Sequence, residues 1–235
     1  MDMMKKTLAE SLPGLGLELP DEIQDQLCAF GHAMVRQNEV MNLTGITEDD
    51  QVAKLHLIDS LTVLKCADLK GKSLIDVGCG AGFPGVPTAI GCPEAKVTLL
   101  DSLAKRMNWL ETILPQLGVA NAECVTARAE EAVATRRESY DYATSRAVAR
   151  LNILLELTAP YVKIGGAVLA LKGAMAREEL EEAKSAISKL GLQVEAVKDF
   201  TVDKDTVHTV IVLRKVRPTP AKFPRRYAKI KQAPL

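Results

Sequence analysis

A glycine-rich turn between a predicted strand and a predicted helix constrains this chain more than any other feature. The turn reads Asp76-Val-Gly78-Cys-Gly80-Ala-Gly82-Phe-Pro84-Gly85 and follows the strand-like stretch 73–78. Glycines let a backbone turn sharply and approach a ligand without interference from a Cβ atom. The helix that follows offers free N–H groups at its N-terminus to an anion. The pattern therefore predicts a nucleotide-like ligand at the end of this strand.

The rest of the chain alternates strand-like and helical stretches of the length found in parallel βαβ units. The predicted strands are 73–78, 96–101, 123–126, 140–144, 166–172, 192–200 and 207–216. Helices are predicted from about 84, from about 102, at about 148–162 and at about 176–190. The last two strands have no helix between them and are expected to pair antiparallel. We therefore predict an α/β fold with a mostly parallel, doubly wound seven-stranded sheet.

Three segments are expected along the chain. Apolar residues recur at helical spacing over about 20–41 and 49–67, so residues 1–70 are predicted to form a helical N-terminal extension. Residues 71–216 form the sheet domain that binds the ligand. Residues 217–235 form a C-terminal tail that carries bases and no acids, although the whole chain has 30 Lys and Arg against 30 Asp and Glu. A local basic segment on a neutral chain is typical of contact with a polyanion.

Composition excludes several classes of protein. The 235 residues are 47% hydrophobic and 26% charged, close to the average of globular domains. No apolar run approaches the ~18 residues of a membrane span, and the N-terminus has no signal-peptide pattern. We therefore expect a cytoplasmic protein without membrane contact. The 5 scattered cysteines contain no C-x-x-C pair or Cys/His cluster, so neither a disulfide scaffold nor a metal site is expected. No extra apolar helix face stands out, which favours a monomer.

Two cofactors compete for the glycine-rich turn. The spacing of Gly80, Gly82 and Gly85 matches the G-x-G-x-x-G fingerprint of dinucleotide enzymes. The pattern that starts at Asp76 matches more tightly, and a carboxylate there suits the cationic ammonium and sulfonium of S-adenosylmethionine (SAM) better than a pyrophosphate. Asp101 ends the next strand, where an acid that binds a ribose is expected with either cofactor. The turn therefore favours SAM, and a nicotinamide oxidoreductase stays open.

Further motifs along the chain are similar to those of one bacterial family. They are Asn38, Met41-Asn-Leu-Thr44, His56 with Asp59-Ser-Leu61, the glycine-rich turn, Val97-Thr-Leu-Leu-Asp-Ser102 with Lys105-Arg106, Ser145-Arg-Ala-Val-Ala149, Leu169-Ala-Leu-Lys-Gly173 and Thr219-Pro-Ala-Lys-Phe-Pro-Arg-Arg226. Together they resemble the ribosomal RNA small subunit methyltransferase G family, also called glucose-inhibited division protein B. The resemblance runs from about residue 38 to the end of the chain. Cys79 and Ile230 depart from it, standing where Ser or Thr and Pro are common.

The resemblance implies a class I SAM-dependent methyltransferase with a Rossmann-like fold. It implies methyl transfer to N7 of guanine-527 in the decoding-region loop of 16S rRNA, with 16S rRNA or the small ribosomal subunit as partner. It also implies cofactor contacts at Gly78, Phe83, Ala129-Glu130 and Arg146, in addition to Asp76, Gly80 and Asp101, which the glycine-rich turn and the second strand supply. Arg146 could meet either the cofactor carboxylate or an RNA phosphate.

Three polar residues are candidates for the substrate side, each with a structural alternative. His56 and Asp59 lie three residues apart on one helix face, where they could project toward the substrate or form a polar contact between the extension and the sheet. Lys172 ends the fifth strand, at the edge where open α/β sheets bind ligands, so it could contact RNA or lie on the surface. N7 of guanine carries no proton, so methyl transfer requires no general base, and no catalytic residue is assigned.

The basic tail is expected to bind RNA. Lys222, Arg225 and Arg226 lie close to two aromatic residues, a combination that suits phosphate contact and base stacking. Deleting the residues after Arg217 is then expected to remove RNA methylation while SAM binding stays intact. Two other functions remain open: a non-catalytic ribosome assembly factor that binds SAM and RNA, and a SAM methyltransferase with another substrate.

Overall fold

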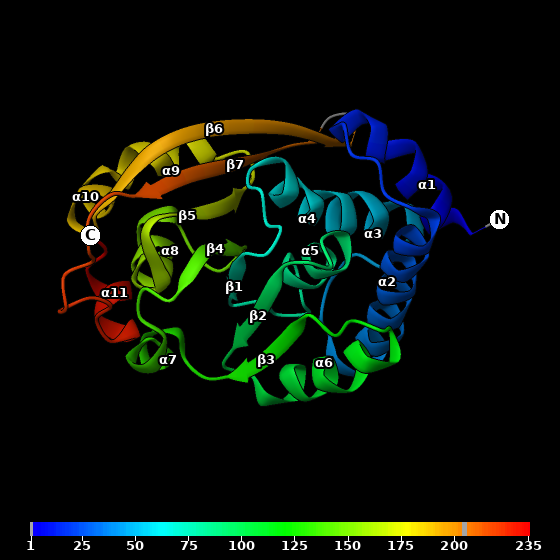
Figure 1. Ribbon diagram of the computed structural model, residues 1–235, viewed down its shortest axis with the longest axis horizontal. Helices are drawn as coiled ribbons and strands as arrows, with labels where there is room; N and C mark the ends of the chain where they lie inside the picture. The colour runs from blue at the N-terminus through cyan, green and yellow to red at the C-terminus, as the bar shows by residue number, and fades with distance from the viewer. Residues whose placement is uncertain (1, 204–205) are drawn as a thin grey trace.

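One seven-stranded sheet organises the computed structural model, which describes residues 2–203 and 206–235. The strand order is β3-β2-β1-β4-β5-β7-β6 (Figure 1). The strands are β1 Ser73–Val77, β2 Lys96–Asp101, β3 Ala122–Thr126, β4 Tyr140–Arg146, β5 Val162–Lys172, β6 Leu192–Asp203 and β7 Thr206–Lys215. Strands β1 to β5 pair in parallel, while β7 is antiparallel to both β5 and β6. The predicted α/β class, the seven strands and the antiparallel final strand are therefore confirmed.

Helices connect the strands and cover both faces of the sheet. They are α1 Met3–Ser11, α2 Asp21–Met41, α3 Asp49–Val52, α4 Asp59–Leu61, α5 Gly85–Gly91, α6 Ala104–Gln116, α7 Ala129–Arg136, α8 Leu151–Thr158, α9 Ala176–Glu182, α10 Lys184–Lys189 and α11 Tyr227–Gln232. Short 3₁₀ turns occupy Leu12–Leu15, Thr62–Lys65 and Ala159–Tyr161, and a π-helical turn, η2, occupies Ala53–Ile58.

The structure corrects several predicted boundaries. The helix expected over about 148–162 is confined to α8 and its 3₁₀ turn, and Val162 already belongs to β5. The single helix expected over about 176–190 is two helices that meet at Ala183. Helix α1 lies within the predicted helical extension 1–70 but had no predicted range of its own, and α7 was not predicted; both are short and have few buried residues.

Side chains alternate between two hydrophobic cores because successive residues of a strand point to opposite faces. In β1, Leu74 joins the core under α2, α5, α6 and the N-terminal helices, whereas Ile75 joins the core under α7, α8 and α10. The N-terminal segment adds Phe30, Met34 and Leu57 to the first core, so it shares that core with the sheet.

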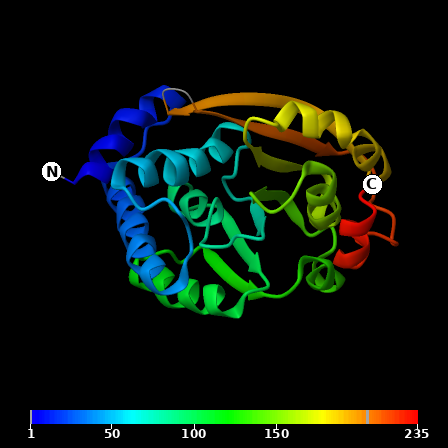
Figure 2. The same cartoon turned by 180° about the vertical axis from the view of Figure 1, so that it is seen from behind.

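The two ends of the chain lie on opposite sides of the sheet domain. Helices α1 and α2 lie at the end of the molecule that carries the N-terminus, α4 lies beside α5, and α11 lies beside α7 and α8 (Figures 1 and 2). Phe223 and Ile230 of the C-terminal segment are buried in the second core. Among the described residues, no helix is long and apolar enough to cross a membrane.

Candidate functional site

The glycine-rich turn leaves β1 and reaches α5 along a path that only glycine allows at key points. Gly78 has a φ of 74°, and a Cβ atom there would lie 2.5 Å from Val148 Cγ2. A Cβ atom on Gly85 would lie 2.3 Å from Leu99 Cδ2 and 2.8 Å from Asp76 Oδ2. The turn therefore packs closely against its own domain and presents backbone to the space beyond β1.

Asp76 supports this turn from inside the protein. Its Oδ2 accepts a hydrogen bond of 2.7 Å from the N–H of Gly85, and Oδ1 is buried with no partner among the described residues. Burial raises the pKa of Asp76 to about 7. The side chain has no exposed surface and supports the turn from below, and its direct contact with a cofactor stays a prediction.

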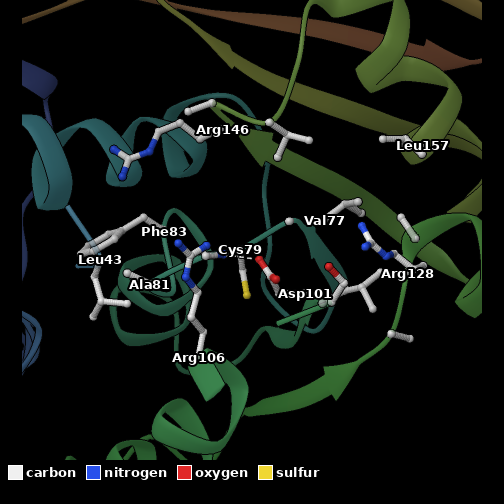
Figure 3. A pocket seen from close by; sticks show the side chains of 18 of the residues that line it. Leu43, Val77, Cys79, Ala81, Phe83, Asp101, Arg106, Arg128, Arg146 and Leu157 are labelled. Atoms are coloured by element: carbon white, nitrogen blue, oxygen red, sulfur yellow. Dashed lines mark hydrogen bonds between the residues drawn. The ribbon is translucent and has the colours of Figure 1, made fainter. Parts of the chain in front are cut away.

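A cavity of about 500 Å³ opens above the turn. It lies where the strand order reverses between β1 and β4, the place where doubly wound sheets bind their ligands. Predicted site residues in its lining are His56, Gly78, Gly80, Phe83, Asp101, Ala129, Glu130 and Arg146. Sequence reasoning did not assign Arg106, Arg128, Leu157 and Tyr227 to the site, yet they also line the cavity. Figure 3 shows Arg146 and Phe83 at one end of the cavity and Arg128 and Leu157 at the other.

Asp101 is held at the end of β2 by two backbone groups. Its Oδ2 accepts from the N–H of Gly80 and its Oδ1 from the N–H of Leu103, both at 2.9 Å. These bonds tie the acid to the glycine-rich turn and fix its orientation in the cavity wall. Each oxygen keeps a lone pair for a hydroxyl donor, as the expected ribose contact requires.

Arg146 connects β4 to the N-terminal helices. Its guanidinium donates to Asp59 Oδ2 at 2.7 Å and to the carbonyl of Leu55 at 2.8 Å, and lies 5.2 Å from the centre of the Phe83 ring. Asp59 is almost fully buried and also pairs with His208 Nδ1 at 2.7 Å. Burial alone would raise the pKa of Asp59, but the hydrogen bond from His208 and the charge of Arg146 hold it below its ordinary value.

His56 completes this group as a neutral ring. Burial, with a smaller contribution from the charge of Arg146, lowers the pKa of His56 to about 4. Its ring stacks on Phe83 at 4.8 Å between centres. Arg146 Nη2 lies 3.2 Å from Nδ1, and Thr44 Oγ1 lies 2.9 Å from Nε2. Nδ1 also lies 3.2 Å from the carbonyl of Leu55, so it faces a donor in Arg146 and an acceptor in Leu55 at the same distance.

A second hollow of about 570 Å³ adjoins the cavity. The two share His56, Arg146, Ala147 and Val148 in their walls, and the second also contains Asp59, Lys172, Glu179 and His208. The structure therefore brings together His56, Asp59 and Lys172, the three candidates for the substrate side. The sequence pattern did not predict that they lie close to one another. His208 lies far from them in the chain, and no local pattern marked it.

Lys172 has partners within this second hollow. Its ammonium donates to the carbonyl of Ala149 at 2.6 Å and pairs with Glu179 at 2.7 Å, and only 7% of the residue is exposed. It is neither a free surface lysine nor an unpaired cation. Glu179 also accepts from the N–H of Leu151 at 2.7 Å, so this pair fixes the start of α8 beside the hollow.

The basic C-terminal residues differ in what they offer to a partner. Lys222 and Arg226 are exposed. Arg225 instead pairs with Glu156, a carboxylate with no exposed surface: its Nε donates to Oε1 at 2.8 Å and its Nη2 to Oε2 at 2.6 Å. In this structure the Arg225 guanidinium is bound to Glu156, and its RNA contact stays a prediction.

One group of possible metal ligands lies away from both hollows. Asp2, His32 and Asp49 meet on the surface, with His32 Nε2 3.0 Å from Asp2 and Nδ1 3.7 Å from Asp49. Both ring nitrogens already face carboxylates, so the group is accounted for as contacts between side chains at the surface.

Comparison with known proteins connects the sequence to one family. The family model described as rRNA small subunit methyltransferase G matches residues 23–208. Ribosomal RNA small subunit methyltransferase G of Alkaliphilus metalliredigens is 41% identical over 226 residues, which cover 94% of this chain and 95% of that protein. The protein of the same name from Lactobacillus johnsonii is 41% identical over 239 residues, covering 99% of this chain and 100% of its own length.

Solved structures agree on the fold. M. jannaschii TYW2 in complex with AdoMet matches with a TM-score of 0.56 at 14% identity, over 68% of this chain and 76% of that chain. A SAM dependent methyltransferase from Aquifex aeolicus matches with a TM-score of 0.54 at 19% identity, over 69% and 92% of the two chains. The fold is therefore that of class I SAM-dependent methyltransferases.

Proposed function

Because this chain belongs to the rRNA small subunit methyltransferase G family, we propose that it transfers a methyl group from SAM to N7 of guanine-527 in 16S rRNA. The observation that carries the proposal is the pair of adjoining hollows with His56 and Arg146 in their common wall. Such a pair provides one space for a cofactor and one for a base, with a short path between them.

The residues of the first cavity fit SAM. Its volume of about 500 Å³ lies within the range of ordinary cofactor sites. Asp101 would hold the ribose hydroxyls, Glu130 and the backbone of Ala129 the adenine edge, and Arg146 the carboxylate. The backbone of Gly78 lines the cavity and would pass close to the methionine part. When bound, SAM supplies an electrophilic methyl group on its sulfonium.

In this reaction the chain has to position the base and the methyl group, and it does not have to transfer a proton. N7 of guanine has an in-plane lone pair and carries no proton, so the chain needs no general base. His56, neutral at pH 7 because its pKa is about 4, packs on Phe83 and faces the guanidinium of Arg146. These three side chains fix the wall between the hollows and exclude water from it. Holding the two reactants in line in this way can supply much of the rate acceleration.

RNA contacts are proposed around the second hollow and on the C-terminal segment. Lys172 would meet the target nucleotide, with Arg146 as the alternative if it does not hold the cofactor carboxylate, and the exposed Lys222 and Arg226 would meet phosphates further along. Arg225 would contribute only if phosphate competes with Glu156. Phosphate contacts of this kind predict RNA binding that weakens as salt rises. With this substrate, we propose that the protein acts in the cytoplasm.

The test is transfer of a labelled methyl group from SAM. Small subunits and free 16S rRNA from cells that lack this protein are incubated with the purified chain, and the modified base is mapped. The expected result is incorporation at one site, N7 of guanine-527. The same RNA from cells that contain the protein serves as the control and accepts no further label.

Other outcomes separate the alternatives. Binding of SAM and RNA without incorporation identifies a non-catalytic assembly factor, and incorporation at another base or in another molecule identifies a different substrate. A chain that binds NAD in preference to SAM contradicts the proposal at its first step.

A further inference from the structure

The C-terminal strap, residues Thr219–Gln232, is fixed firmly to the sheet domain. The backbone N–H and the guanidinium of Arg225 all donate to the buried Glu156 of α8. Arg137 donates to the carbonyl of Phe223, whose side chain is buried, and Ile230 has no exposed surface. Bonds and apolar burial thus hold the strap in one position, which a mobile basic tail would not have.

This position brings Tyr227 into the cofactor cavity. Tyr227 is partly buried against the second core and lines the cavity together with Leu157, Arg128 and Glu130. It also lines a neighbouring hollow with Arg128 and Glu130, so it borders both hollows close to the start of α7. Arg128 and Leu157 mark the end of the cavity that is remote from Arg146 (Figure 3).

We propose that Tyr227 forms the wall of the adenosine end of the cofactor cavity, and that the strap is thereby part of the cofactor site. The inference rests on the proposed SAM site, in which Ala129 and Glu130 hold the adenine. An aromatic ring at that end offers a flat apolar surface to a heterocyclic base. Helix α8 makes the arrangement rigid, because consecutive residues serve both parts: Glu156 anchors the strap and Leu157 lines the cavity.

Ligand binding to the full chain tests the proposal without RNA or turnover. Calorimetric titration would measure the Kd of S-adenosylhomocysteine and of 5′-methylthioadenosine, which lacks the amino-acid end. Tyr227→Ala should raise both Kd values by the same factor, about tenfold, the usual effect of removing an aromatic that stacks on a base. Tyr227→Phe keeps the ring and should stay within about twofold of the parent chain. Lys229→Ala, an exposed change on the same helix, is the matched control, and its Kd values should also stay within about twofold of those of the parent chain.

Three results would overturn the proposal. Unchanged Kd values for Tyr227→Ala would remove Tyr227 from the site. A loss for S-adenosylhomocysteine alone would assign the residue to the amino-acid end, and an equal loss for Tyr227→Phe would assign the contact to the hydroxyl instead of the ring. If the parent chain binds neither ligand, the proposed function fails and this inference fails with it. Thermal denaturation of each variant shows that a lost affinity does not come from unfolding.

Discussion

Two arginine–carboxylate pairs hold the N-terminal helices and the C-terminal strap to the sheet domain. The two pairs differ in their surroundings. At one end of the cavity, Arg146 of β4 meets Asp59 of the N-terminal helices at 2.7 Å. On the opposite side of the molecule, Arg225 of the strap meets Glu156 of α8 at 2.6 Å. In both pairs the carboxylate is buried almost completely, with 1% of Asp59 and 0% of Glu156 exposed.

The first pair belongs to a network of polar side chains at the second hollow, whereas the second pair is an anchor that is bonded to no other side chain among the described residues. Asp59 also bonds His208, Arg146 faces His56, and all four residues line the second hollow. Glu156 is bonded only to the side chain and backbone of Arg225 among the contacts of the described residues. A pair whose members also bond other side chains of a ligand site can change its contacts when a ligand or a proton binds. A pair bonded only to each other contributes to stability alone. The first pair is therefore expected to govern chemistry and pH dependence, and the second to govern stability.

The largest expected effect comes from breaking the anchor. Arg225→Ala leaves the buried Glu156 carboxylate without a partner, which should lower the free energy of unfolding by about 3–5 kcal/mol. Urea denaturation followed by circular dichroism measures the loss. Arg226→Ala, the exposed neighbour, is the matched control and should change stability by less than about 0.5 kcal/mol.

A second variant identifies the cause of that loss. Replacing both partners, with Glu156→Met and Arg225→Met together, removes the unpaired charge and should recover most of the stability. Equal instability of the double variant and Arg225→Ala would show that the hydrogen bonds themselves, and not the buried charge, hold the strap.

The next effect is a pH dependence with two opposing signs. His56 has a pKa of about 4 in the folded protein against 6.5 in the unfolded chain, so the stability present above pH 6.5 is lost as the pH falls toward 4. Asp76 has a folded pKa of about 7 against 3.8, so the stability present below pH 3.8 is lost as the pH rises toward 7. The change amounts to about 3 kcal/mol for His56 and about 4 kcal/mol for Asp76, and in the parent chain the two largely cancel.

Single variants should expose the two slopes. His56→Gln leaves Asp76, so stability should fall as the pH rises from about 4.5 to 7; Asp76→Asn leaves His56, so stability should fall as the pH drops over the same range. The double Met variant of the anchor should keep the flat profile of the parent chain. Slopes of the same sign in His56→Gln and Asp76→Asn would show that other groups dominate the titration.

Much of the fold followed from local patterns. Strand β2 has its predicted ends, 96–101, because a short run of apolar residues between polar ones has only one reasonable boundary. The stretch 49–67 is predicted as one helix, but it contains the π-helical turn η2. The sequence does not reveal this turn, because one extra residue in a turn hardly changes the apolar spacing. The glycine-rich turn predicted the cavity because strand, turn and helix are consecutive in the chain.

The contacts that separate the two pairs could not be predicted in this way. His208 and Asp59 are 149 residues apart, and Arg225 and Glu156 are 69 apart. Such contacts depend on strand order and on which face each helix covers, and neither leaves a local pattern. For the same reason the tail was expected to bind RNA independently of SAM. Since Tyr227 lines the cavity, deletion after Arg217 is now expected to weaken both SAM binding and methylation.

The network at Arg146 should tolerate little change in shape. Arg146→Lys keeps the charge, but a lysine cannot bond Asp59, Leu55 and His56 together or stack on Phe83. Because the wall between the hollows then moves, RNA methylation should fall by about 100-fold in kcat/KM. Arg150→Lys, at an exposed arginine paired with Glu178 and Glu182, is the control. Retention of more than about a third of the activity by Arg146→Lys would make Arg146 a structural residue like Arg225.

The smallest expected effect tests how much of the stabilisation of buried Asp59 comes from His208 and how much from Arg146. His208→Phe keeps a ring of similar size and removes one hydrogen bond to a buried carboxylate, which should lower the free energy of unfolding by about 1.5 kcal/mol. The loss should stay at this low level because the His208 side chain is 27% exposed, so water can take its place, and because Arg146 still neutralises Asp59. Urea denaturation at pH 8, beside Arg225→Ala, gives the comparison directly. A loss as large as that of Arg225→Ala would mean that Asp59 also depends on a single partner, and the distinction between network and anchor would fail.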